Sequence, residues 1–120
     1  MASTSITGTY NITCYEGVTL KRSINWADSA KRSYDLTDFT AHMQVRPSDT
    51  SEEVLANLTT ENGYIVLGST KPNIGIHIPS ELTANIPTGM YVYDLLVTAP
   101  NGEVDRLISG SFHVKPKVTK

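Results

Sequence analysis

The sequence predicts an all-β fold, and two observations carry that prediction. Apolar and polar residues alternate with a period of two in the stretches 18–26, 40–46, 91–98 and 104–114. Successive side chains of a strand point to opposite faces of a sheet, so this alternation places one set in a core and the other in water. Turn-forming residues separate the stretches at regular spacing, which is typical of a β-sandwich or a barrel.

About seven or eight strands follow from this pattern when the shorter stretches are included. Arg22 and Arg106 interrupt the apolar sides of their stretches, so we place them near strand ends or edges. The expected strands are 10–15, 18–26, 40–46, 54–60, 64–67, 74–78, 91–99 and 103–114.

Glycine-containing turns connect the later strands. An Asn-Gly pair at 62–63 lies between two predicted strands, and a second pair at 101–102 lies between the last two. Asn-Gly is a strong hairpin signal because both residues tolerate positive φ. We therefore expect Gly63, Gly89 and Gly102 to hold backbone conformations that other residues would strain.

One segment is expected to be helical. Pro79 suits a first helical turn and Pro87 ends it, which predicts a short helical turn near 79–84. Of the two all-β architectures we expect a single immunoglobulin-like (Ig-like) antiparallel β-sandwich over residues 10–114. A flexible N-terminal arm at 1–9, which can also act as an added strand, and an exposed C-terminal tail at 115–120 flank it.

The apolar positions of the strands define a candidate core. Six residues are expected to have structural roles: Trp26, Gly63, Gly89, Tyr91, Tyr93 and Gly102. The expected core residues are Trp26, Met43, Val45, Leu58, Ile65, Tyr91, Tyr93, Leu95, Ile108 and Phe112.

Composition excludes several classes of protein. The 120 residues carry a formal net charge of −2, without the Lys and Arg excess that nonspecific nucleic-acid binding needs. No stretch approaches the ~20 apolar residues of a membrane span, and no secretory signal is visible at the N-terminus. The single cysteine, Cys14, excludes an intrachain disulfide and a multi-cysteine zinc site.

Candidate chemical sites are weak, and we predict no catalytic, cofactor-binding or metal-binding residue. His42 and His113 lie on the polar sides of their strands, and the acidic residues fall mostly in turns. Cys14 lacks an activating partner and is expected to be buried and inert. No glycine-rich phosphate loop is present. Five tyrosines could form a binding face or simply reflect strand propensity, namely Tyr10, Tyr15, Tyr64, Tyr91 and Tyr93.

Several separated motifs share their order with one protein family. They are Trp26-Ala-Asp28, the run Tyr-Asp-Leu-Thr-Asp-Phe-Thr-Ala-His-Met-Gln-Val-Arg at 34–46, Leu-Thr-Thr-Glu-Asn-Gly at 58–63, Ile-Pro-Thr-Gly-Met-Tyr-Val-Tyr-Asp-Leu at 86–95, Asn-Gly-Glu-Val-Asp-Arg at 101–106 and Val114-Lys-Pro116. The series resembles small virion structural proteins of tailed bacteriophages and prophages over about residues 10 to 119. It resembles more loosely the N-terminal modules of phage baseplate proteins that carry receptor-binding fibres. The chain departs from the family at Asp38, where Gly is usual, and at Tyr64, which replaces a second Gly.

The resemblance implies a non-enzymatic structural component of a phage tail, baseplate or fibre-attachment region. Such a protein needs no cofactor and contacts other virion proteins, including copies of itself, in a symmetric assembly. It would be assembled in the bacterial cytoplasm and would reside in the virion, contacting neither nucleic acid nor membrane. A capsid decoration or cement protein, and a carbohydrate- or receptor-binding module, are the alternatives.

The two ends of the chain carry the candidate assembly contacts. A free sheet edge can accept a strand from a partner, and the arm could supply one. The basic tail leaves a net charge of −5 on the remainder, so electrostatic docking would use the tail. The candidates are Ser3, Thr4, Ser5, Ile6 and Thr7 in the arm, and Lys115, Lys117 and Lys120 in the tail.

Overall fold

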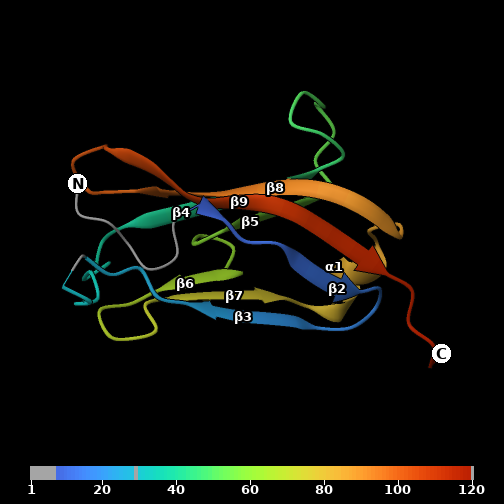
Figure 1. The fold of residues 1–120 in the computed structure, drawn as a ribbon, viewed down its shortest axis with the longest axis horizontal. Coiled ribbons are helices and arrows are strands. Elements are labelled where there is room, and N and C mark those ends of the chain that lie inside the picture. Colours follow the sequence, from blue (N-terminus) through green and yellow to red (C-terminus); the bar gives the residue numbers. More distant parts are fainter. Residues whose placement is uncertain (1–7, 29, 120) are drawn as a thin grey trace.

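A computed structural model describes residues 8–28 and 30–119, which fold into two sheets packed face to face (Figure 1). One short helix, α1 (Ser80–Ala84), lies at one end of the sandwich, as the two prolines predict. The strands are β1 (Gly8–Thr9), β2 (Ile12–Tyr15), β3 (Leu20–Ile24), β4 (Thr40–Arg46), β5 (Ala56–Thr59), β6 (Ile65–Leu67), β7 (Ile74–Ile78), β8 (Gly89–Thr98) and β9 (Val104–Lys115).

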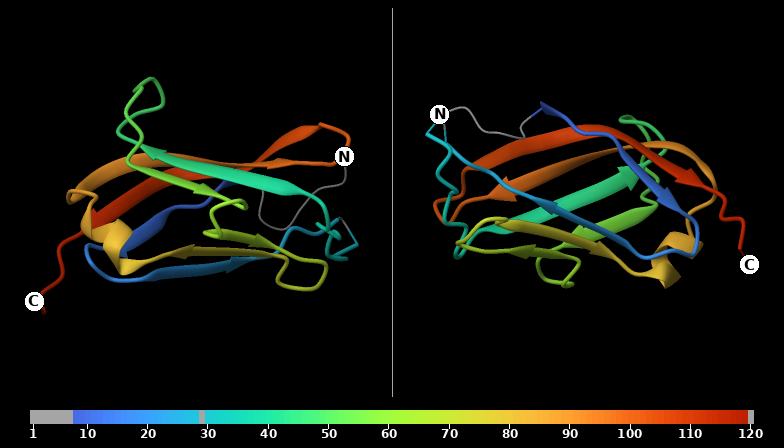
Figure 2. Two further views of the ribbon diagram at one scale, coloured as in Figure 1. Left: turned by 180° about the vertical axis from the view of Figure 1, so that it is seen from behind. Right: turned by 60° about the horizontal axis from the view of Figure 1, so that its bottom comes forward.

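The strand order makes the fold an Ig-like β-sandwich. The larger sheet has the order β1-β9-β8-β4-β5, with β2 also paired to β9, and the smaller sheet has the order β3-β7-β6. β1 and β2 run parallel to β9, whereas all other paired strands are antiparallel. The prediction of an antiparallel sandwich therefore holds except at this edge, where the first strands of the chain join the last (Figure 2).

The core lies between the two sheets. Of the ten expected core residues, nine are at most 4% exposed, and Tyr91 is only partly buried against them. Tyr93 packs edge-on to Phe112, with ring centroids 6.3 Å apart. Trp26 is 3% exposed and lies 4.6 Å from the Tyr34 ring, measured between centroids.

The buried side chain of Asn73 holds the Trp26 backbone in place. Its Oδ1 accepts from the Trp26 N–H at 2.8 Å, and its Nδ2 donates to the carbonyls of Trp26 at 2.8 Å and Tyr34 at 2.9 Å. These bonds satisfy the backbone groups of Trp26 and Tyr34, which lie beyond the end of β3. The amide of one side chain thereby extends the smaller sheet by a residue.

A β-bulge in β9 overturns part of the predicted alternation. Leu95 lies opposite Ile108, but the next residue of β8 lies opposite Arg106, so Leu107 is an extra residue. Leu107 is buried, and Val104 is 55% exposed. The prediction that Val104 and Arg106 face the core is wrong, because the bulge reverses the alternation before Ile108.

The two Asn-Gly turns have different roles. The turn at 101–102 joins β8 to β9 as a hairpin, with Gly102 at φ +92°. The turn at 62–63 joins β5 to β6, which lie in different sheets, so it is not the predicted hairpin turn. Gly63 still has a φ of +83°, which shows that Asn-Gly marks a tight turn without specifying which strands pair.

The sheet extends slightly beyond the predicted domain limits. Gly8 and Thr9, at the end of the predicted arm at 1–9, pair with Ile108 and Ser109 as a short added strand, which is one of the two alternatives for this segment. Lys115 is the last residue of β9 and pairs with Tyr15, so the tail begins one residue later than predicted.

Candidate assembly surfaces

The predicted assembly contacts are only partly visible. Residues 3–7 and Lys120 lie outside the described residues. Lys115 is exposed at the end of β9. Lys117 is half-buried, and its Nζ would lie 2.9 Å from a Cβ added at Gly17, so the start of the tail crosses the β2–β3 turn. Val118 beyond it is 96% exposed.

An asparagine covers the free edge of β5. The β4–β5 pairing leaves the backbone groups of Asn57 and Thr59 pointing away from β4, because the N–H of Thr60 bonds the Ala41 carbonyl and bonded pairs alternate. Asn62 Oδ1 accepts from the Thr59 N–H at 3.0 Å, and its Nδ2 donates to the Asn57 carbonyl at 3.0 Å. The Asn62 amide thus occupies positions that a neighbouring strand would use.

An arginine bridges the edges of β2 and β3 on the opposite side. The Arg22 guanidinium donates to the carbonyl of Thr13 at 3.2 Å and to that of Lys21 at 2.9 Å. The Tyr15 carbonyl, which also points outward, accepts from the Val18 N–H. Arg22 does lie on an edge strand as predicted, and it ties the two sheets together there.

The outer face of the larger sheet carries a polar cleft of about 350 Å³ under the 47–55 loop, which rises above this face (Figures 1 and 2). Arg46 braces that loop: its Nη1 donates to the Ser51 carbonyl at 2.6 Å, and its Nε donates to Gln44 Oε1 at 3.1 Å. Asp94 and Arg106 both line the cleft. Within the described chain they form no ion pair with each other, because Asp94 lies opposite Ser109 and Arg106 lies opposite Leu96.

The five tyrosines do not form one binding face. Tyr93 is 4% exposed and its hydroxyl donates to the Tyr10 carbonyl. The Tyr91 hydroxyl donates to the Pro87 carbonyl at 2.5 Å, the tyrosine corner of this fold class. Only Tyr10 and Tyr15 have more than a third of their surface exposed. Strand propensity and packing account for the placement of the other three tyrosines.

The groups considered for catalysis and metal binding lie apart. His42 Nε2 lies 2.5 Å from Asn57 Oδ1 on the outer face of the larger sheet, and His77 lies on the smaller sheet. Over residues 8–28 and 30–119, no three His, Cys, Asp or Glu side chains gather as metal ligands. Cys14 is 2% exposed, and burial raises the pKa of its thiol, partly offset by Arg22. No helix in the described part of the chain is long and apolar enough to cross a membrane.

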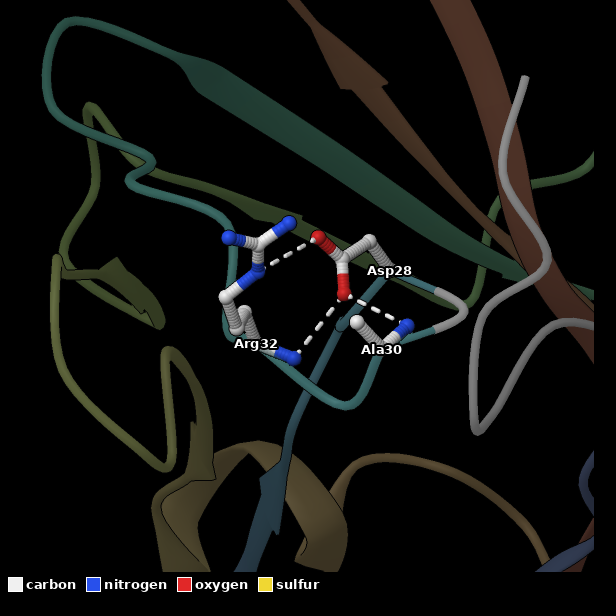
Figure 3. A network of polar contacts seen from close by, with 3 residues as sticks. All are labelled: Asp28, Ala30 and Arg32. Atoms are coloured by element: carbon white, nitrogen blue, oxygen red, sulfur yellow. Dashed lines mark hydrogen bonds and ion pairs between the residues drawn. The ribbon is translucent and has the colours of Figure 1, made fainter.

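A polar turn follows Trp26 and directs the chain toward β4 (Figure 3). Asp28 Oδ1 accepts from the N–H groups of Ala30 and Arg32, each at 2.9 Å, and Oδ2 lies 3.4 Å from Arg32 Nε. The hydrogen bond from the Arg32 N–H is the main cause that lowers the pKa of the Asp28 carboxyl below its usual value. Desolvation opposes it, and the hydrogen bond from the Ala30 N–H lowers the pKa further. This carboxylate acts as a local turn element and lies on the surface of the sandwich.

Sequence reasoning did not predict the bonds by which side chains cover the sheet edges and extend the smaller sheet. Arg22, Asn62 and Asn73 each bond backbone groups of segments that are distant in sequence or on another strand. Gly110 was also missed: a Cβ there would lie 2.7 Å from the Tyr10 carbonyl oxygen. A polar residue inside an apolar stretch is the only local signal for such roles, and it marked Arg22 alone.

Two packed sheets, the parallel first strand and the tyrosine corner define an Ig-like module. No family model and no curated protein matches the chain. Among solved structures it is similar to fibronectin(III)-like modules of Clostridium thermocellum CbhA, with 14% identity, a TM-score of 0.42 and coverage of 97% of this chain and 98% of that one. Murine CRIg has 9% identity and a TM-score of 0.41, with 98% and 97% coverage. Drosophila OTK extracellular domains 3–5 have 12% identity and a TM-score of 0.43, with 94% and 35% coverage. These similarities concern the fold alone.

Proposed function

We propose that the chain is a non-enzymatic structural component of a tailed phage particle, in the tail, baseplate or fibre-attachment region. The observation that carries the proposal is the ordered series of motifs between Trp26 and Pro116. Its neighbours would be other virion proteins and further copies of itself, and its location would be the virion.

The surface of the sandwich is compatible with such a role. Its outer faces expose isolated apolar side chains, including Val66 at 63% and Met90 at 60%. Symmetric assembly multiplies weak contacts, so a single copy needs no large apolar patch of its own.

The test is the composition of purified particles. Particles of the phage or prophage that carries the gene would be purified on a density gradient and digested for quantitative mass spectrometry. We expect the chain at a fixed multiple of another virion protein, and cryo-electron density that distinguishes a tail position from a capsid decoration. A chain that stays in the soluble lysate and is absent from particles would contradict the proposal.

The two ends of the chain provide variants for the same experiment. Deletion of residues 1–7 stops short of Gly8, which pairs with β9, and therefore leaves the described sheet intact. If the arm is an assembly element, this deletion lowers the copy number per particle. A matched truncation of residues 116–120 examines the basic tail in the same way.

A glycan- or receptor-binding module is the second candidate, and the cleft under the 47–55 loop favours it. Asp94 and Arg106 offer an acceptor and donors that no other group in the described chain engages. Titration with oligosaccharides, followed by the backbone amide resonances of Ser109 and Gly110, would detect binding. Shifts that disappear in both Asp94→Asn and Arg106→Gln would support this function, and unchanged spectra would oppose it.

A further inference from the structure

The edge of β6 has no side chain bonded across it within the described residues. In the β6–β7 pair, the Gly68 N–H bonds the Asn73 carbonyl and the His77 N–H bonds the Tyr64 carbonyl. Bonded pairs alternate along an antiparallel ladder, so the backbone N–H and C=O groups of Ile65 and Leu67 point away from β7. Within the described residues no group bonds them, whereas Asn62 covers β5 and Arg22 bridges β2 and β3.

A groove runs beside this open edge. It has a volume of about 380 Å³ and lies between β6 and the 36–39 turn. Leu36, Phe39 and Leu67 supply apolar lining, and Asp38 is the single charged residue among those that line it. The groove can therefore hold a small apolar side chain of an added strand and favours basic flanking residues.

The C-terminal tail matches these properties. Val118 is 96% exposed, the highest value among the exposed large apolar side chains of the described residues, and Lys117 precedes it. Valine and threonine at 118 and 119 favour extended backbone, and Pro116 prevents continuation of β9 by removing a donor.

The tail lies away from the β6 edge of its own chain. Its four described residues, 116–119, span at most about 14 Å when extended, and Lys117 lies against Gly17 in the β2–β3 turn. Figure 1 shows the C-terminal end at one extremity of the long axis and β6 in the opposite half. In this arrangement, contact between the tail and β6 is made between two molecules.

We propose that the tail of one copy, residues 116–119, adds as a strand to the β6 edge of a second copy. Val118 enters the groove beside Phe39, and Lys117 lies near Asp38. Each copy has one tail and one edge, so the contact is head-to-tail and produces rings or filaments. This inference deepens the proposed assembly role, on which its biological meaning rests.

The test measures self-association of the purified full chain by sedimentation equilibrium over a concentration series. Deletion of residues 116–120 removes the donor. Leu67→Pro removes an outward N–H without removing a bond to β7. An edge strand tolerates proline at such a position. Asp38→Asn keeps a residue that accepts the φ of +67° and removes the charge, which provides a second edge variant if the proline variant does not fold.

We expect the tail deletion and Leu67→Pro each to weaken association by about tenfold or more, and Asp38→Asn by several-fold. An equimolar mixture of the tail-deleted chain and an edge variant, each monomeric alone, should form dimers and nothing larger, because one intact tail meets one intact edge. Lys21→Thr, at an exposed position of β3 that is distant in sequence from both the tail and the groove, is the matched charge control and should change nothing.

Three results would overturn the inference. In the first, the wild-type chain remains monomeric up to roughly 1 mM. In the second, association survives deletion of the tail, which would indicate a β6–β6 pair or a contact through the N-terminal segment. In the third, the mixture of the tail-deleted chain and the edge variant stays monomeric. The assay uses no phage component. Its failure is therefore distinguishable from absence of the chain from particles, which bears on the proposed function alone.

Discussion

Replacing Asn73 by alanine should destabilise the sandwich. The amide makes three bonds of 2.8–2.9 Å, and two of them engage the buried N–H and C=O of Trp26. A buried backbone group left without a partner costs about 1–3 kcal/mol. In the Asn73→Ala variant the Trp26 N–H loses its partner, whereas the Trp26 carbonyl still accepts from the Tyr34 N–H at 3.0 Å. We therefore expect a loss of about 1–3 kcal/mol out of the ~5–15 kcal/mol that stabilises a typical domain.

Equilibrium unfolding in urea measures this loss. With a slope of ~2 kcal/mol per M, a loss of about 2 kcal/mol lowers the midpoint by about 1 M. Asn85→Ala is the matched control, because Asn85 is exposed at the end of α1, and it should stay within ~0.5 kcal/mol of the wild type. Equal midpoints for Asn73→Ala and Asn85→Ala would refute the view that Asn73 extends the smaller sheet.

Three further outcomes follow from the described contacts. Gly110→Ala would place a Cβ 2.7 Å from the Tyr10 carbonyl oxygen. It should lower the free energy of unfolding by about 1–3 kcal/mol and speed amide hydrogen exchange in β2. Gly68→Ala, where a Cβ meets no atom within 4 Å, should have neither effect. The pKa of Asp28 is lowered in the fold, so its charge stabilises the fold above the unfolded pKa of about 4, and this contribution is lost as the pH falls through the lower folded pKa. Asp28→Asn should therefore be less stable than the wild type at pH 7, and the gap in melting temperature should narrow as the pH falls below about 4. Alkylation of Cys14 should be about 100-fold slower in native than in unfolded protein, and fast labelling of the native chain would contradict its burial.

Local alternation was sufficient to predict the strands and the core. Strand side chains alternate strictly, so Met43, Leu95 and Phe112 could be assigned to the interior without knowledge of their neighbours. The same rule failed at Val104, because an inserted residue at Leu107 reverses the alternation and leaves no signature in an apolar run.

Pairing between distant segments was beyond local pattern. No local sequence signal near 62–63 indicates that β5 and β6 lie in different sheets. The same turn residues serve a hairpin and a crossing between sheets. Parallel pairing of β2 with β9 is likewise a property of the whole chain and not of either strand.

The candidate site was predicted least well. Sequence pattern and charge singled out the two chain ends, 1–9 and 115–120. Of these the structure describes only residues 8–9 and 115–119. The open edge of β6 depends on which residues of Ile65–Leu67 point outward and on where Asn62 and Arg22 lie. Those relations are three-dimensional, and a polar residue in a turn gives no sign of the backbone group that it bonds.

The joining of the first strands to the last has a consequence for synthesis. Asn11 and Ser111 are bonded although they lie 100 residues apart, and every pair between β2 and β9 has the same separation. While the chain is being synthesised, β2 has no partner until β9 has emerged from the ribosome. The larger sheet therefore closes only after residues 112–115 are free to pair, and a chain interrupted before Phe112 would carry an unpaired strand that invites aggregation.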